Sequence, residues 1–231
     1  MKEVNPFKVL AKMEEHYNEL SHNYLGIETI QDFLSDELRK KAILFDLFQI
    51  GEQMNRLPKS FLRHLNQKDI VGLISIRNHI VHGYDQLDYD VIKKVIEKEI
   101  HPFLESIKQM AIIEYHKHLN SMLGKNVKVF IDRPKGYVHK GIFYELNYGY
   151  IKDIVAPDYE YQDGYIIDED RAIESFCFGK VIAIIHREND VEDKLVISIN
   201  NKDYSVEEIE RLVHFQEQFF KSKVTKTIII L

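Results

Sequence analysis

Apolar residues recur at helical spacing from the N-terminus to about Met122. Over 37–57 they form one helical stripe with intervals of four and three, at Ile43, Leu47, Ile50, Met54 and Leu57. Similar stripes occur early and late in this half, at Phe7, Leu10, Met13, Tyr17 and Leu20, and at Val91, Val95, Ile96, Ile100, Phe103 and Ile107. These patterns predict helices over 6–23, 27–35, 37–57, 67–82 and 88–120, with a kink at Pro102, that pack as a bundle.

After Gly124 the pattern changes to short alternating runs separated by Pro, Gly, Asn and Asp, which is typical of strands. The predicted strands are 127–131, 144–151, 165–167, 181–185 and 195–199, with a closing strand at 225–231. Ser205 and Glu208 form a capping box, which predicts a helix from there to about Lys221. We therefore expect a multidomain α+β protein: a helical bundle over 1–120, a change of structure near 120–126, and a small β-barrel with one packed helix over 124–231.

Composition narrows the functional classes. The chain has 231 residues, a net charge of −6 and a single cysteine, Cys177, which excludes an internal disulfide and a thiolate zinc cluster. No stretch approaches the ~18 apolar residues of a membrane span, and the N-terminus lacks a signal-like apolar run, so we expect a cytoplasmic protein without a membrane partner. Neither half has a basic excess, so any contact with RNA should be small and local.

One octapeptide, residues 77–84, concentrates reactive side chains at the predicted end of a helix, with Gly83 at the C-cap position. Arg77 and His82 lie about 140° apart around the helix axis, so only a long side chain reaching past the helix end brings them together. A fixed cation beside a group that titrates near neutrality suits phosphodiester chemistry, with Asn78 orienting either group and Tyr84 stacking on a base. Alternatively, Arg77 and Asn78 cap helix carbonyls and His82 is a half-buried histidine without a catalytic role.

With this octapeptide, residues 1 to about 115 resemble the HEPN superfamily, specifically the HepT-like toxins. The matching residues are Arg77, Asn78, His82 and Tyr84, together with the segment 48–57 and the downstream helix. The resemblance implies a homodimeric helical bundle that cleaves RNA through the 2′-hydroxyl without a metal, with Arg77 and His82 catalytic and Asn78 and Tyr84 supporting. It also implies a nucleotidyltransferase antitoxin as a partner, which can attach AMP to the tyrosine.

In the second half, carboxylates spaced across loops at a barrel mouth could bind magnesium, or they could be solvated turn residues. Residues 124 to about 222 resemble the soluble inorganic pyrophosphatases through 147–151, the spacing of Asp158 and Asp163, 179–182 and 192–196. By position, the resemblance assigns magnesium and phosphate contacts to Tyr148, Asp158, Asp163, Glu192 and Lys194.

This part of the chain also departs from the pyrophosphatase pattern. The run 158–163 keeps its terminal aspartates but lacks the family's glycine and proline, and the expected Tyr-Lys pair of the last helix falls near Phe219 and Phe220. Positively charged side chains that hold pyrophosphate stabilise the transition state, and their loss weakens catalysis. We therefore rely on the resemblance for the pyrophosphatase-like fold more than for pyrophosphatase activity.

Three functional hypotheses follow. The first, which we favour, is a HepT-like metal-independent endoribonuclease toxin with a fused, degenerate pyrophosphatase-like domain. The second is a magnesium-dependent phosphohydrolase whose helical bundle serves for dimerisation. The third is a non-catalytic protein that binds a nucleotide or a partner. The first is favoured because Arg77, Asn78, His82 and Tyr84 are all present, whereas the pyrophosphatase set is incomplete.

Overall fold

A computed structural model of the chain describes residues 4–63, 65, 74, 77–78, 80 and 88–227. The chain divides into two compact units, Met1–Ile112 and Ile113–Leu231. This division lies within a helix, earlier than the change of apolar pattern near 120–126. The reason is that the last turns of that helix pack on the second unit, where the Tyr115 hydroxyl donates a buried 2.6 Å hydrogen bond to Gln162.

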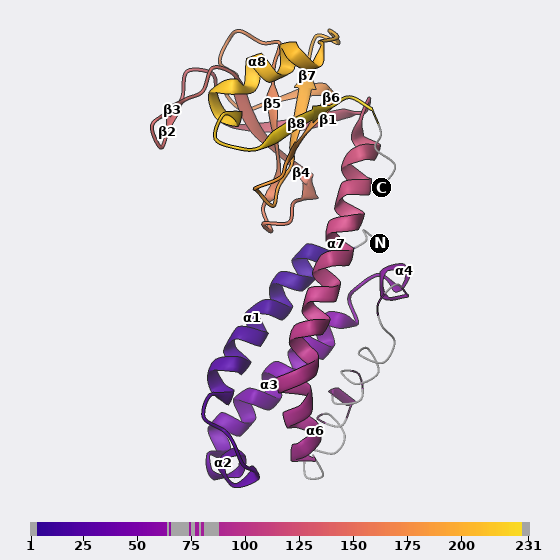
Figure 1. The fold of residues 1–231 in the computed structure, drawn as a ribbon, viewed down its shortest axis with the longest axis vertical. Helices are drawn as coiled ribbons and strands as arrows, with labels where there is room; N and C mark the ends of the chain where they lie inside the picture. The colour runs from indigo at the N-terminus through magenta and orange to yellow at the C-terminus, as the bar shows by residue number, and fades with distance from the viewer. Residues whose placement is uncertain are drawn as a thin grey trace. The chain divides into compact units, whose positions relative to one another are not determined.

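The first unit is helical. Its described elements are α1 (Pro6–Tyr24), α2 (Ile30–Ser35), α3 (Glu37–Met54), α4 (Lys59–Leu62), α6 (Tyr89–Lys94), the π-helical turn η2 (Val95–Glu99) and α7 (Ile100–Met122), which continues into the second unit (Figure 1). Side-chain caps fix where α1 to α3 begin, because the carboxylate, amide or hydroxyl of Asn5, Thr29 and Asp36 accepts a backbone N–H of the following turn. The segment expected to be helical over 67–82 lies mostly outside the described residues.

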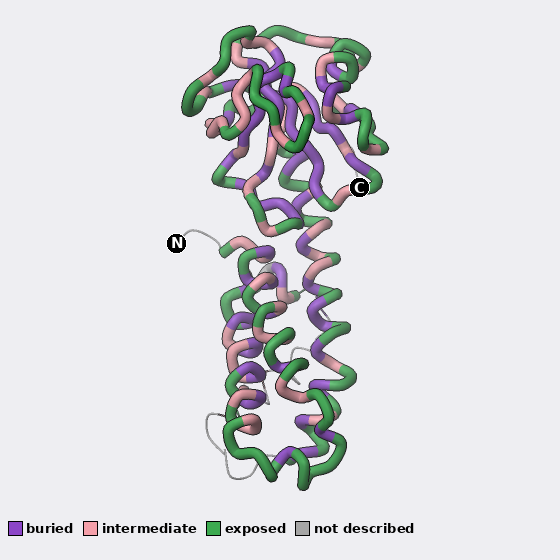
Figure 2. The backbone as a smooth tube through the Cα atoms, turned by 90° about the vertical axis from the view of Figure 1, so that its left-hand side faces the viewer, coloured by how far each residue is buried: buried purple, intermediate pink, exposed green. Residues whose placement is uncertain are grey.

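The apolar stripes predicted from the sequence form the core of this unit. Ile43, Leu47, Ile50 and Met54 are buried on α3, and α1 packs against them with Leu10, Met13 and Leu20. In Figure 2 buried positions alternate with exposed ones along these helices, as amphipathic helices require. Some details differ from the prediction. Helix α2 begins at Ile30 rather than at 27, α3 ends at Met54 so that Leu57 is buried from the following turn, and the short α4 was not predicted.

Helix continues from Tyr89 to Met122, close to the predicted range, but it widens once. The backbone N–H of Ile100 bonds to the carbonyl of Val95, five residues back, which makes η2 a single π-helical turn. Pro102 follows inside this continuous helix, where its ring would crowd the carbonyl four residues back and no N–H is available to bond to it. The irregularity predicted at Pro102 therefore takes the form of a wide turn immediately before it.

The second unit is a closed barrel. Its strands are β1 (Asn126–Arg133), β2 (Val138–His139), β3 (Ile142–Phe143), β4 (Asn147–Val155), β5 (Tyr161–Ile166), β6 (Phe176–Arg187), β7 (Lys194–Ser198) and β8 (Ser222–Thr225). The sheet order is β1-β4-β5-β7-β6, and a further β1–β6 pairing closes these five strands into a barrel, with β8 added beside β6. All pairings are antiparallel except β5 with β7. Closure removes the free edges that an open sheet would expose.

Two residues of the segment 147–151 serve this architecture directly. Asn147 is fully buried, and its side-chain oxygen accepts the backbone N–H groups of Lys135 and Ile173 at 3.0 and 2.9 Å, which ties two loops to β4. A Cβ at Gly149 would lie 2.0 Å from the carbonyl oxygen of Phe130 on β1. Only glycine therefore permits the observed approach of β1 and β4.

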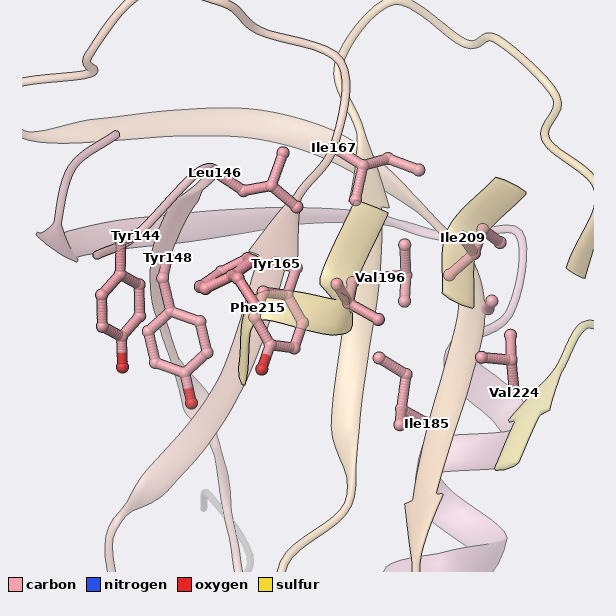
Figure 3. Close-up of a cluster of buried hydrophobic side chains, with 12 residues drawn as sticks. Tyr144, Leu146, Tyr148, Tyr165, Ile167, Ile185, Val196, Ile209, Phe215 and Val224 are labelled. Carbon is pink, nitrogen blue, oxygen red and sulfur yellow. The ribbon is translucent and has the colours of Figure 1, made fainter. Parts of the chain in front are cut away.

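Helix α8 (Val206–Glu217) covers the barrel core. The Ser205–Glu208 capping box is present as predicted, but the helix ends at Glu217 rather than near Lys221. Figure 3 shows Phe215 of α8 among Tyr144, Tyr148 and Tyr165, whose hydroxyls point to the same side of the cluster, while Ile209 of α8 lies at its other end toward Val224. The buried core therefore ends in a polar layer on that side.

The last strand begins earlier than predicted. It spans 222–225 instead of 225–231, and residues 228–231 are not among those described. The β2–β3 hairpin was not predicted, because two-residue strands leave no alternating pattern. Among the helices described, none is long and apolar enough to cross a membrane.

Candidate functional site

In the helical unit, the candidate site is built around Arg77. Its Nε donates to a carboxylate oxygen of Glu52, and its Nη1 donates to Oδ1 of Asn78 at 2.9 Å. Glu52 lies on α3, so this contact joins two segments that are 25 residues apart. The guanidinium is 30% exposed and is therefore both oriented and open to solvent.

This arrangement bears on the two interpretations of Arg77 and Asn78. The described bonds of the guanidinium go to side chains, which is the way a functional arginine is commonly oriented. Glu52 offsets part of the positive charge, so its main contribution is to fix the direction of the guanidinium. His82 and Tyr84, the other two predicted site residues, lie outside the described residues.

In the barrel, four of the five predicted residues meet in one hydrogen-bonded cluster. The Tyr148 hydroxyl donates to Oδ2 of Asp163 at 2.6 Å, and the Lys194 ammonium donates to the same oxygen at 2.9 Å and to Glu192. Glu192 also accepts the backbone N–H of Asp163 at 2.8 Å. Burial raises the pKa of Glu192, an effect that the Lys194 ammonium opposes and the Asp163 carboxylate reinforces.

The fifth residue, Asp158, takes no part in these bonds. Its carboxylate accepts the backbone N–H of Glu160 at 3.0 Å within an exposed turn, as the alternative interpretation of the loop carboxylates proposed. Asp158, Asp163 and Glu192 do not gather as three oxygen ligands anywhere in the described part of the chain.

The barrel cluster does not fit a magnesium ion. Magnesium requires oxygen ligands together with several bound waters. Here the side chain of Lys194 is 5% exposed and bonds to both carboxylates, so an internal cation already occupies the position between them. A divalent ion would have to displace this buried ammonium, which would then lie next to it as a like charge.

Further residues of this cluster were not predicted. Gln162 is fully buried and donates to Glu192 and to the Asp193 carbonyl, while it accepts from Tyr115 of α7. Arg133 lies on the neighbouring tyrosines, with its guanidinium carbon 5.0 Å from the ring centre of Tyr148. A single glutamine within an alternating strand does not reveal from the sequence which residues its side chain will contact.

A second group that the sequence did not reveal comprises His116, His186 and Asp193, whose potential ligand atoms all lie within 4.8 Å of one another. No sequence spacing joins Asp193 to either histidine, because the three residues come from α7, β6 and the loop before β7. Burial alone would raise the pKa of Asp193, but hydrogen bonds from His116 and His186 outweigh it and lower the pKa to about 2.

The comparison with protein families concerns the helical unit that carries Arg77. Residues 13–110 match the family model Ribonuclease HepT-like. The matched region thus begins within α1 and ends within α7. A candidate RNase of Methanocaldococcus jannaschii is 26% identical over 82 residues, which are 36% of this chain and 68% of that protein. A candidate RNase of Caldanaerobacter subterraneus is 27% identical over 82 residues, which are 36% of this chain and 73% of that protein.

Solved structures similar to the chain are inorganic pyrophosphatases. That of Ehrlichia chaffeensis has a TM-score of 0.38 and 13% identity, covering 45% of this chain and 86% of its own. That of Coxiella burnetii has a TM-score of 0.35 and 16% identity, covering 45% of this chain and 88% of its own. At these values the likeness does not decide what the barrel does.

Proposed function

We propose that the chain is a HepT-like endoribonuclease that cleaves RNA through the 2′-hydroxyl without a metal ion. The observation that carries this proposal is the family match over 13–110, within which Arg77 is oriented by Glu52 and Asn78. Arginine is suited to this chemistry because it stays charged at every physiological pH and offers several donors to phosphate oxygens.

In the proposed reaction, the 2′-oxygen attacks the adjacent phosphorus and the 5′-oxygen leaves, so that a 2′,3′-cyclic phosphate and a 5′-hydroxyl form. His82 transfers the proton, and Arg77 stabilises the negative charge that develops on the phosphoryl oxygens. Asn78 holds the guanidinium through its 2.9 Å bond, and Tyr84 contacts the substrate by stacking or by a hydrogen bond.

The biological setting forms part of the proposal. A toxin of this kind acts on cellular RNA in the cytoplasm, and a nucleotidyltransferase antitoxin that attaches AMP to Tyr84 would silence it. A homodimer would supply the second wall of the site, because four side chains near one helix end leave one side of the substrate open.

The barrel takes an accessory role in this proposal. Its carboxylates are held by Lys194 in a cluster that does not suit magnesium, so we do not assign it pyrophosphate hydrolysis. Release of phosphate from pyrophosphate with magnesium, lost in Asp163→Asn, would instead support the phosphohydrolase hypothesis.

The test compares RNA cleavage by the full chain with that of two single variants. His82→Ala and Arg77→Ala should each abolish cleavage and growth inhibition, while circular dichroism and the oligomeric state stay unchanged. The double variant should lose no more than either single variant, because the two groups act as one unit. Cleavage should persist in EDTA and should fail when the scissile nucleotide carries 2′-deoxyribose. Cleavage that stops in EDTA, or full activity in His82→Ala, would refute the proposal.

A further inference from the structure

The group His116, His186 and Asp193 has the composition of a metal centre. Nδ1 of His186 lies 2.6 Å from Oδ2 of Asp193, and Nδ1 of His116 lies 3.3 Å from the same oxygen. Two imidazole nitrogens and one carboxylate oxygen therefore converge on one point within the second unit. This donor set suits zinc and related transition metals rather than magnesium or calcium.

The surroundings of His186 hold its Nδ1 toward that point. Its Nε2 lies 3.0 Å from Oγ1 of Thr225, and the Thr225 hydroxyl in turn reaches the carbonyl of Ile184 at 3.5 Å. When the Thr225 hydroxyl donates to the Ile184 carbonyl, its Oγ1 can accept a hydrogen bond from Nε2–H of His186. Nδ1 faces Asp193, to which it donates a hydrogen bond in the absence of metal, and on metal binding this proton would leave so that Nδ1 could ligate the ion.

The site is anchored on its carboxylate side and open on its histidine side. The Asp193 side chain is 6% exposed, and its other oxygen accepts the backbone N–H of Arg187 at 3.2 Å. The His116 and His186 rings are 31% and 25% exposed, so an ion and its waters can reach them.

We propose that His116, His186 and Asp193 bind one zinc-class transition-metal ion, which fastens the last turns of α7 to β6 and completes its coordination with water. Zn–N and Zn–O bonds of about 2.0–2.1 Å in a tetrahedral site separate the ligand atoms by about 3.3 Å. The His116 spacing already matches this separation, and His186 has to retract by about 0.7 Å.

The test measures zinc binding to the full chain, purified without a polyhistidine tag, by competition with a chromophoric chelator. One equivalent should bind, and His186→Ala and Asp193→Asn should each weaken binding by about 100-fold or more. His118→Ala is the matched control, because His118 is on the same helix but outside the group, and it should bind as the unaltered chain does. Cobalt should give visible absorption bands of a low-coordinate site that disappear in His186→Ala.

The alternative is that the three side chains share protons only. The unaltered chain would then bind no zinc, or would bind it with the same affinity in His186→Ala as in His118→Ala, and either result overturns the proposal. If His186→Ala fails to fold, His116→Ala replaces it, since the more exposed His116 ring contributes less to packing.

A different face of the barrel independently supports a second inference. Five aromatic rings run across four neighbouring strands of its outer surface: Phe178 and Phe176 on β6, Phe130 on β1, Tyr150 on β4 and Tyr161 on β5. We call this set the aromatic face. Successive rings along it have centroids 5.6 to 6.4 Å apart, and Phe176 and Phe178 are 45% and 64% exposed.

Two lysines lie among these rings. The Lys128 ammonium is 3.8 Å from the centre of Phe176, and the Lys152 ammonium is 4.2 Å from the centre of Phe130. Neither lysine forms an ion pair among the residues that the structure describes, so both charges are available to an anion. This interleaving of rings and cations is how proteins hold single-stranded nucleic acids, by stacking on bases and contacting phosphates.

From this geometry we infer that the aromatic face binds single-stranded RNA. The choice of RNA over DNA rests on the proposed ribonuclease function. A second copy of the chain is a poorer occupant, because a symmetric contact would bring Lys128 and Lys152 of the two copies together as like charges.

The test measures binding of a fluorescent 2′-O-methyl oligouridine, which cannot be cleaved through the 2′-oxygen, so binding is read even if the ribonuclease proposal fails. The Phe176→Ala/Phe178→Ala variant should bind about tenfold more weakly or worse, since each stacked base contributes about 1–3 kcal/mol. Phe143→Ala and Phe219→Ala, which remove comparably exposed rings on β3 and after α8, should bind like the unaltered chain. The Lys128→Ala/Lys152→Ala variant should show a weaker dependence on salt.

Equal affinity in the aromatic-face and control variants would overturn this inference, as would an absence of binding by the unaltered chain. Light scattering provides the other decisive outcome. Self-association that is lost only in Phe176→Ala/Phe178→Ala would show that the face is a contact between copies of the chain and would also overturn it.

Discussion

The two units use charged side chains in different ways. In the helical unit, Arg77 and Glu52 are paired but remain 30% and 35% exposed, so a substrate phosphate can compete for the guanidinium. In the barrel, the pairs Lys194–Glu192 and Arg187–Glu217 are at most 5% exposed. A buried pair is costly to break and has no surface for a ligand, whereas a half-exposed pair is inexpensive to rearrange. The half-exposed pair therefore fits the chemistry proposed for the helical unit, and the two buried pairs stabilise the barrel.

The largest expected effect tests the stability side of this comparison. Glu217 accepts two bonds from Arg187, at 2.6 and 3.1 Å, and a third from the Tyr165 hydroxyl at 2.6 Å. Glu217→Ala leaves a buried guanidinium without its main partner and should lower the free energy of unfolding of the barrel by about 3–5 kcal/mol. Urea unfolding followed by tyrosine fluorescence measures this loss, and Glu210→Ala, at an exposed position of the same helix, is the control. If Glu217→Ala lowered the free energy of unfolding no more than Glu210→Ala does, the buried Arg187–Glu217 pair would not stabilise the barrel.

The next effect tests the chemical side. Arg77→Lys keeps the positive charge but loses the planar fork that bonds to Glu52 and Asn78 at once. RNA cleavage should fall by about 100-fold, which corresponds to about 2.7 kcal/mol, with little change in thermal stability. Single-turnover cleavage and a melting curve on the same sample separate the two readouts. Arg63→Lys, at an exposed position near α4, should leave both unchanged.

A third prediction concerns pH and the barrel. Hydrogen bonds from both histidines lower the pKa of Asp193 from 3.8 to about 2, so the native state favours the ionised carboxylate. This contribution is fully present above about pH 4 and is lost as the pH falls toward 2, which amounts to about 2 kcal/mol. Unfolding measured with a chelator present should show this component in the unaltered chain and not in Asp193→Asn. If the two chains lose stability in parallel over this range, the hydrogen bonds to Asp193 are not responsible.

The smallest expected effect separates two contributions of Glu52 to the candidate site, its negative charge and its hydrogen bond to Arg77. Glu52→Gln keeps an oxygen that can accept from Arg77 but removes the negative charge. If Glu52 mainly orients the guanidinium, cleavage should change by less than about tenfold, which corresponds to about 1.4 kcal/mol. Glu52→Ala removes the acceptor and should cost clearly more. Equal losses in the two variants would show that the charge matters rather than the direction of the guanidinium.

Sequence periodicity predicted the architecture well, because each element contributes a buried face with a regular spacing. The stripe on α3 and the capping box of α8 are local signals, and both are present in the structure. The register that closes β1 against β6 is not local, and no sequence pattern reports it. Helix and strand ends were missed by a few residues where a turn continues the apolar pattern, as at Leu57.

For the candidate sites too, local features were predicted from the sequence and non-local ones were not. The motif predicted Arg77 and Asn78 together. The resemblance to pyrophosphatases predicted one site of Tyr148, Asp158, Asp163, Glu192 and Lys194, and the structure brings all of these together except Asp158. The resemblance could not show that Lys194 occupies the position a metal would take, because that depends on where one flexible side chain points. Neither spacing nor resemblance pointed to the proximity of His116 and His186, since the two residues are 70 positions apart, one on a helix and one on a strand.

The segment 147–151 shows how the residues of a recognisable motif can be required by the fold alone. Asn147 is required to tie two loops, and Gly149 is required by the approach of β1 to β4, whether or not any substrate is bound. Selection for folding alone would therefore retain both residues. A sequence search that scores this segment would recover chains that share the barrel, whatever reaction each of them performs.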